Sequence, residues 1–197
     1  MSWFDPRRSE VVGMLALWLS NTSGGDSMAG RIHRYGAKLD WRGNQGSGTR
    51  RYDGYGRRFE AQVDGKPLLA GSADPAFRGD PALHNPEDLL LIALSRCHML
   101  SYLALCAREG IVVTEYSDRP EGVMQIDARG GGRFTSVVLQ PLVTIGDADQ
   151  QARANELHAT AHSVCYIASS CNFPVELRAS VSAAAVDATI ALAEPTP

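Results

Sequence analysis

Cysteine is the residue type in this 197-residue chain that is best suited to covalent chemistry, and the chain has four: Cys97, Cys106, Cys165 and Cys171. None of them sits in a Cys-x-x-Cys pair, which argues against a zinc ribbon or a thioredoxin-type motif. The chain is also too long and too poor in cysteine to be a disulfide scaffold. The pattern is typical of an intracellular protein with some buried thiols and one or two reactive ones, so we expect a cytoplasmic location.

Cys97 is the strongest candidate nucleophile. It lies midway along the most hydrophobic stretch of the chain, between Arg96 and His98. The thiolate is the reactive form, so an apolar setting alone would leave this cysteine inert, as a small buried packing residue. On a helix its two neighbours point about 100° away from it. A reactive Cys97 therefore needs a cation that another part of the structure supplies.

Cys165 follows two histidines, His158 and His162, at spacings that place all three on one face of a helix. Such a face can in principle bind a metal ion. Only one helix contributes, however, and no carboxylate completes the set. We therefore expect a structural or hydrogen-bonding role for the histidines, and neither a metal site nor a cofactor.

The region before Cys97 predicts a strand meander and then a helix. Residues 31–70 alternate between polar and apolar and are interrupted by glycines, as in antiparallel strands joined by turns. Asn85 is a good N-cap and Pro86 fits the first helical position. The helix body is apolar nearly all round, which predicts burial in a core, and Gly110 ends it.

Three more strand patterns follow, and a second helix is expected from near Asp147 to Asn172, beyond which Pro174 prevents continuation. The closing pattern, VELRASVSAAAV, predicts a last strand. The order of elements indicates an α+β fold with a mostly antiparallel sheet. No P-loop, dinucleotide-binding fingerprint or nucleophile elbow is present.

Charge and composition exclude some classes of partner. The net charge of −3 gives no strong field for nucleic acid or an anionic membrane. At the N-terminus, Arg7 and Arg8 precede a short apolar run, but no small-x-small cleavage site follows and the run is too short to span a bilayer. We interpret residues 1–30 as an extension, either disordered or a short helix, with Met28 as an alternative start. Residues 31–190 then form one domain and residues 191–197 a tail.

Three stretches together resemble the OsmC/Ohr family of thiol-dependent peroxidases. In that family an Asn-Pro-Glu helix start is followed, ten residues after the Glu, by the reactive cysteine, and here these are Glu87 and Cys97. AHSVCYIASSCNFPVEL resembles the family's second-cysteine helix, although Tyr166 stands where many relatives have Pro. DWRGNQGSGT resembles its first strands. The resemblance covers roughly residues 31–181 and is greatest to the OsmC-like branch.

The resemblance implies an intertwined homodimer, in which a long β-sheet wraps two buried helices, and an activity, the reduction of organic hydroperoxides. It implies that Cys97 attacks the peroxide, that Cys165 resolves the product as a disulfide, and that an external dithiol restores the enzyme. Cys171 is the competitor to Cys165, whereas we expect Cys106 to be a packing residue.

The family also uses a Glu and an Arg beside the reactive thiol. The Glu corresponds to Glu87. Arg78, in the segment before the helix, matches the OsmC-like pattern best, while the Ohr pattern leaves Arg50 or Arg51 open. Ten residues of helix span about 15 Å, so a Glu87 that assists Cys97 must come from the partner chain.

Other functions remain open. The chain could be a non-catalytic module that binds an apolar molecule at the dimer interface, which would not need Cys165. A cysteine-dependent hydrolase would need His98, His158 or His162 beside the thiol. If the peroxidase prediction holds, the apolar neighbours Leu94, Met99 and Leu100 favour organic peroxides over hydrogen peroxide.

Overall fold

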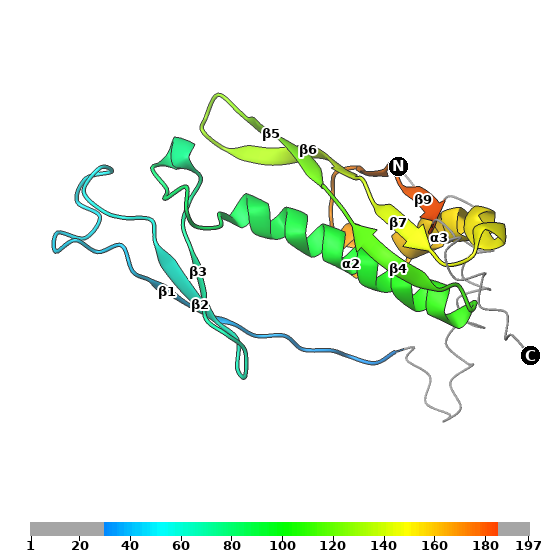
Figure 1. Cartoon of the computed structure of the whole chain (residues 1–197). Helices are drawn as coiled ribbons and strands as arrows, with labels where there is room; N and C mark the ends of the chain where they lie inside the picture. Colours follow the sequence, from blue (N-terminus) through cyan, green and yellow to red (C-terminus); the bar gives the residue numbers. More distant parts are fainter. Residues whose placement is uncertain (1–29, 185–197) are drawn as a thin grey trace, which may run out of the picture. The chain divides into compact units, whose positions relative to one another are not determined.

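The computed structural model describes residues 30–184 (Figure 1). Nearly all of the expected N-terminal extension, the expected tail and the last residues of the expected domain lie outside this range. The chain divides into two units, Met1–Lys38 with Gln62–Pro67, and Leu39–Ala61 with Leu68–Pro197. Every candidate site residue belongs to the second unit.

The N-terminal strands form the expected meander. β1 (Lys38–Trp41), β2 (Phe59–Gln62) and β3 (Leu69–Gly71) make a three-stranded sheet in the order β1-β2-β3, and β2 pairs antiparallel with β3. The long β1–β2 loop is closed at its base, where Nε1 of Trp41 donates to the carbonyl of Gly56 at 2.8 Å. The adjacent glycine, Gly43, is buried, and a Cβ there would overlap the Gly56 carbonyl.

The central helix α2 (Pro86–Arg108) begins and ends as the sequence predicts. The Asn85 side chain accepts from the Asp88 N–H at 2.7 Å, and the Asp88 carboxylate accepts from the Asn85 N–H at 3.2 Å, a complete capping box. At the other end Gly110 takes the left-handed conformation, with φ of +71°, in which glycine carries no Cβ penalty. The helix is therefore continuous from residue 86 to residue 108.

α2 is less buried than its apolar composition on all sides predicts. Within the single chain only one stripe is buried, comprising Leu94, His98, Tyr102, Leu105 and Cys106. Other apolar positions face outward, and Leu100 is 58% exposed. Within residues 30–184, α2 is the one helix whose length and composition would also allow it to cross a membrane. The single chain thus covers part of an apolar surface and leaves the rest uncovered.

Two further three-stranded sheets complete the α+β fold. β4 (Val113–Ser117), β7 (Leu142–Ile145) and β9 (Ser180–Ala183) form one, and β5 (Glu121–Ile126), β6 (Gly132–Leu139) and β8 (Val175–Leu177) form the other. β4–β7 and β5–β6 are antiparallel, whereas β6–β8 and β7–β9 are parallel. The mostly antiparallel α+β prediction is confirmed, although the closing pattern forms two short strands, one in each sheet.

A core cluster packs α2 onto the second of these sheets. Leu94 of α2 and Val137 and Leu139 of β6 are all 0% exposed. Partly buried apolar side chains surround them, including Phe134 and Phe173. Leu94, which was expected to flank the reactive thiol, packs in this core and is not exposed to solvent.

The expected second helix is broken. A 3-10 turn (Ala148–Gln150) leads into α3 (Gln151–Ser163), and a separate short helix α4 (Tyr166–Ser169) follows. Cys165 between them has an extended backbone, with φ of −72° and ψ of 107°, and it is the N-cap of α4. Its Sγ accepts a hydrogen bond from the Ala168 N–H at 3.5 Å. The break follows Val164, whose β-branched side chain is a poor helix former.

Candidate active site

The fold brings Cys97 and Cys165 together. Cys97 lies on α2 and is partly exposed, whereas Cys165, at the start of α4, is completely buried. The two thiols are within hydrogen-bonding reach of each other, and both are free. Burial, reinforced by the contact with Cys97, raises the pKa of Cys165 to about 12. Cys165 is therefore a protonated thiol at neutral pH.

This asymmetry suits two different chemical roles. A thiol must be ionised and accessible to attack a dissolved electrophile, and Cys165 is neither. Cys97 is accessible from solvent and has a second sulfur beside it. The arrangement can therefore convert an oxidised Cys97 to an intramolecular disulfide.

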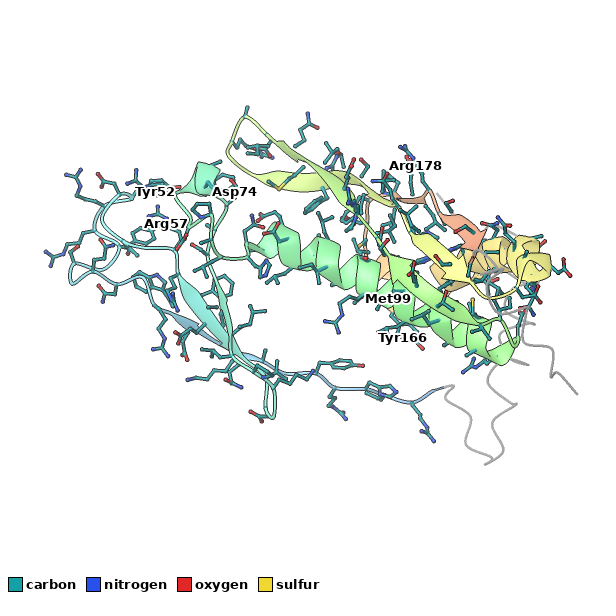
Figure 2. All side chains as sticks on the ribbon, in the orientation of Figure 1. Tyr52, Arg57, Asp74, Met99, Tyr166 and Arg178 are labelled. Atoms are coloured by element: carbon teal, nitrogen blue, oxygen red, sulfur yellow. The ribbon has the colours of Figure 1, made fainter. Side chains whose placement is uncertain are left out.

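The surroundings of the pair include exposed apolar side chains. Figure 2 marks Met99, two residues after Cys97 on α2, and Tyr166, which directly follows Cys165 on α4. Tyr166 is 78% exposed and Leu100, one helical turn beyond Cys97, is 58% exposed. Leu100 and Tyr166 are thus the apolar neighbours that reach solvent, whereas Met99, at two residues along the helix, points about 200° away from Cys97 and does not flank the thiol.

The histidine next to Cys97 points into the core. Nε2 of His98 lies 3.0 Å from Nδ1 of His158, and their rings are stacked. Tyr102 stacks on His158 with a centroid separation of 3.9 Å. Burial lowers the pKa of both His98 and His158 to about 4, and that of His162 is lowered for the same reason. These imidazoles are neutral at pH 7 and supply no cation to the thiol.

His98 and His158 thus have the structural, hydrogen-bonded position that the sequence predicts. His162 contacts the His98 ring, and its Nδ1 is buried without a hydrogen-bond partner within residues 30–184. Within residues 30–184, no three His, Cys, Asp or Glu side chains are grouped so that they could hold a metal ion. The sequence analysis missed the aromatic stack. The stack could have been predicted from two spacings of four residues, which place side chains on one face of a helix: His98 and Tyr102 on α2, and His158 and His162 on α3.

The candidate arginines lie before α2. Arg78 is exposed and ends a 3-10 turn (Pro75–Phe77) with φ of 66°. Asp53 accepts two hydrogen bonds from Arg51, at 3.0 and 2.9 Å, which lower the pKa of its carboxyl, and Arg78 adds to this electrostatically. Arg78 is therefore near the β1–β2 loop, which also contains Arg50. In the part of the chain that the structure describes, none of these arginines hydrogen-bonds to Cys97.

Another arginine of the β1–β2 loop, Arg57, makes several contacts within the loop. The guanidinium of Arg57 lies over the rings of Tyr52 and Tyr55, 4.5 and 4.1 Å from their centroids. It also donates to the backbone carbonyls of both tyrosines. Figure 2 labels Tyr52 and Arg57 on this loop. Arg57 therefore orders the loop that contains Arg50 and Arg51.

Glu87 lies in the first turn of α2, and its Oε2 is buried without a hydrogen-bond partner within residues 30–184. Because α2 is unbroken between them, the ten residues from Glu87 to Cys97 separate the two by about 15 Å. Glu87 does not reach the thiol of its own chain. A buried carboxylate oxygen without a partner is costly, which indicates that a further group pairs with it.

Comparisons with known proteins identify the fold. An uncharacterized protein from Bacillus subtilis, YmaD, is 23% identical over 154 residues, covering 76% of this chain and 94% of its own length. An OsmC-like protein of unknown function from Vibrio cholerae is similar in structure, with a TM-score of 0.68, 26% identity, and coverage of 76% of this chain and 100% of its own.

Another similar structure is that of an organic hydroperoxide resistance protein OsmC from Legionella pneumophila. Its TM-score is 0.56 at 21% identity, and the match covers 77% of this chain and 98% of that protein. The family model described as "OsmC-like protein" matches residues 79–180, which include α2, both cysteines and most of the strands. The chain belongs to the OsmC-like family.

Proposed function

We propose that this protein is a thiol-dependent peroxidase that reduces organic hydroperoxides to alcohols. The observation that carries the proposal is the contact between a partly exposed Cys97 and a buried, protonated Cys165. Membership of the OsmC-like family supports it, as do similar structures named organic hydroperoxide resistance proteins.

In the first step the Cys97 thiolate attacks the distal oxygen of the hydroperoxide. The S–O bond forms as the O–O bond breaks, the alkoxide takes a proton and leaves as the alcohol, and Cys97 becomes a sulfenic acid. In the second step the sulfur of Cys165 attacks the sulfenic sulfur. A disulfide forms, and the hydroxyl of the sulfenic acid leaves as water with the thiol proton of Cys165. An external dithiol then reduces the disulfide.

The proposal assigns supporting roles to Arg78 and Glu87. Arg78 stabilises the Cys97 thiolate and hydrogen-bonds the peroxide, and Glu87 orients the guanidinium. Neither residue hydrogen-bonds to Cys97 within a single chain, so the complete site requires a second copy. Arg50 and Arg51 are the alternatives to Arg78, and Arg51 would first have to leave its ion pair with Asp53.

The proposed second copy also covers exposed apolar side chains on α2 and α4. The exposed apolar side chains of Ile92, Leu100 and Ile167 need a covering partner, and the buried Oε2 of Glu87 needs a hydrogen-bond donor. A homodimer in which two α2 helices meet satisfies both requirements. The second chain's Glu87 would then approach Cys97 of the first.

The substrate class follows from the apolar side chains beside Cys97. Leu100 and Tyr166 favour a hydroperoxide with a bulky apolar group, since burying that group against them contributes binding free energy that hydrogen peroxide lacks. The proposed reaction needs no cofactor, because Cys97, Cys165 and the external dithiol supply the two electrons that reduce each hydroperoxide.

The test is to add one equivalent of cumene hydroperoxide to the reduced protein and map its disulfides by peptide mass spectrometry. We expect a Cys97–Cys165 disulfide, no turnover in Cys97→Ser, and unchanged turnover in the control Cys106→Ala. A Cys97–Cys171 disulfide would transfer the resolving role to Cys171. If Cys97 stays reduced under excess peroxide, the proposal fails and a non-catalytic apolar-binding role replaces it.

A further inference from the structure

We infer that the external reductant attacks the disulfide at Cys97 and that Cys165 is the sulfur that departs. The intermediate of the reductive half-reaction is then a mixed disulfide between the reductant and Cys97. This inference rests on the proposed function, since that function supplies the disulfide. It further assigns which of the two sulfurs the reducing partner contacts.

Access decides between the two sulfurs. Thiol–disulfide exchange requires the incoming thiolate to reach one sulfur while the other leaves, and its rate depends on which sulfur is accessible. Cys165 is 0% exposed, whereas Cys97 is partly exposed. The surface through which a hydroperoxide reaches Cys97 also admits a thiolate. Attack at Cys165 would require α4 to move away from α2.

The Ala168 N–H can bind the sulfur of Cys165 when that sulfur leaves the disulfide. In the reduced protein, Sγ of Cys165 accepts the Ala168 N–H at 3.5 Å, at the N-terminal end of α4. When the disulfide opens at Cys97, Cys165 needs only to return to this hydrogen bond. Because burial disfavours its thiolate, its departure is coupled to uptake of a proton.

The electrons balance over two exchanges. First, one thiolate of the dithiol forms a bond to Cys97 Sγ, the Cys97–Cys165 bond breaks, and Cys165 leaves and is protonated. Second, the other thiol of the reductant loses its proton and attacks the reductant's own sulfur, which closes a cyclic disulfide and releases the Cys97 thiolate. Neither exchange requires access to Cys165, so one dithiol molecule completes the cycle. A monothiol forms the mixed disulfide, which is resolved only by a second monothiol molecule or by return of Cys165.

The experiment uses the full-length protein with its disulfide formed in two ways, by cumene hydroperoxide and, independently of peroxidase activity, by diamide. The probe is a monothiol, N-acetylcysteine, added for short times before an acid quench. Free thiols are then alkylated and the adducts are located by peptide mass spectrometry. We expect roughly tenfold more adduct on the Cys97 peptide than on the Cys165 peptide at the earliest times.

A second measurement tests the accessibility directly. In reduced protein, each cysteine is labelled with a disulfide reagent such as 5,5′-dithiobis(2-nitrobenzoate), and the sites are again resolved by peptide. Cys97 should be labelled before Cys165.

Each outcome decides between the alternatives. Adduct that is mainly on Cys165, or equal on both cysteines, overturns the inference. If diamide forms the disulfide and N-acetylcysteine then labels Cys97, but cumene hydroperoxide forms no disulfide, the proposed peroxidase function fails while the inferred order of exchange stands.

Discussion

Nε2 of His98 lies 3.0 Å from Nδ1 of His158, and this buried contact joins α2, which contains Cys97, to α3, which leads directly into Cys165. Both imidazoles are neutral because burial lowers their pKa to about 4. The contact holds together the two segments that supply the sulfurs. Charging either ring would oppose it.

The first prediction is therefore a loss of stability in mild acid. The folded pKa of each histidine, about 4, is below the ordinary value of 6.5, so the unfolded chain binds more protons between these values. Stability is highest above pH 6.5 and decreases as the pH falls toward 4, by about 3 kcal/mol or more. Urea unfolding at several pH values measures this. His158→Gln should reduce the dependence, while the exposed His33→Gln should leave it intact, and a pH-independent stability would contradict the prediction.

The second prediction concerns the core beneath α2. Leu94→Ala should lower the free energy of unfolding by about 2–5 kcal/mol, because the side chain is completely buried against β6 and its removal leaves a cavity. Leu68→Ala, at a 54% exposed position, should cost about 1 kcal/mol or less. Chemical denaturation of both variants makes the comparison. Equal costs would show that Leu94 is not a core residue.

The third prediction separates the candidate arginines. We expect Arg78→Gln to lower kcat/KM with cumene hydroperoxide by about 100-fold, as loss of an electrostatic contact to reacting atoms typically does. Arg129→Gln, on an exposed turn, is the matched control for removal of one positive charge. A comparable loss in Arg50→Gln or Arg51→Gln, with Arg78→Gln fully active, would transfer the role to the β1–β2 loop.

The fourth prediction tests whether Glu87 acts between chains. Cys97→Ser and Glu87→Gln subunits are each expected to be inactive, or nearly so, when alone. If the two variants are unfolded together and refolded, a heterodimer should contain one site with both native residues, and activity should return to about a quarter of the wild-type value. Activity no greater than the average of the two separate variants would show that Glu87 does not act across the interface.

Much of the fold could be predicted from local signals. Asn85, Pro86 and Gly110 each act within a few residues, so the bounds of α2 follow from the sequence. The break at Cys165 could not be predicted in this way. Val164 weakens the helix locally but does not by itself fix the position of a break. The extended backbone of Cys165 accompanies burial of its thiol, which is a tertiary effect.

The site shows the same division between local and long-range information. The pairing of Cys97 with Cys165 came from resemblance to a family, and the structure places the two thiols in contact. The complete burial of Leu94 could not be predicted, because the face of an all-apolar helix that turns inward depends on packing. The roles of Arg78 and Glu87 stay predictions, since neither hydrogen-bonds to Cys97 within a single chain.

Because α2 is continuous, the number of residues between Glu87 and Cys97 fixes both their separation and their relative orientation. Adding or removing one residue between Glu87 and Cys97 would turn everything beyond it by about 100° and shift it by about 1.5 Å. Cys97 would then face away from Cys165, and His98 away from His158, in the same step. We therefore expect the length of this stretch to be fixed, whereas the exposed hairpin turn at Asp127–Gly131 should tolerate the gain or loss of residues.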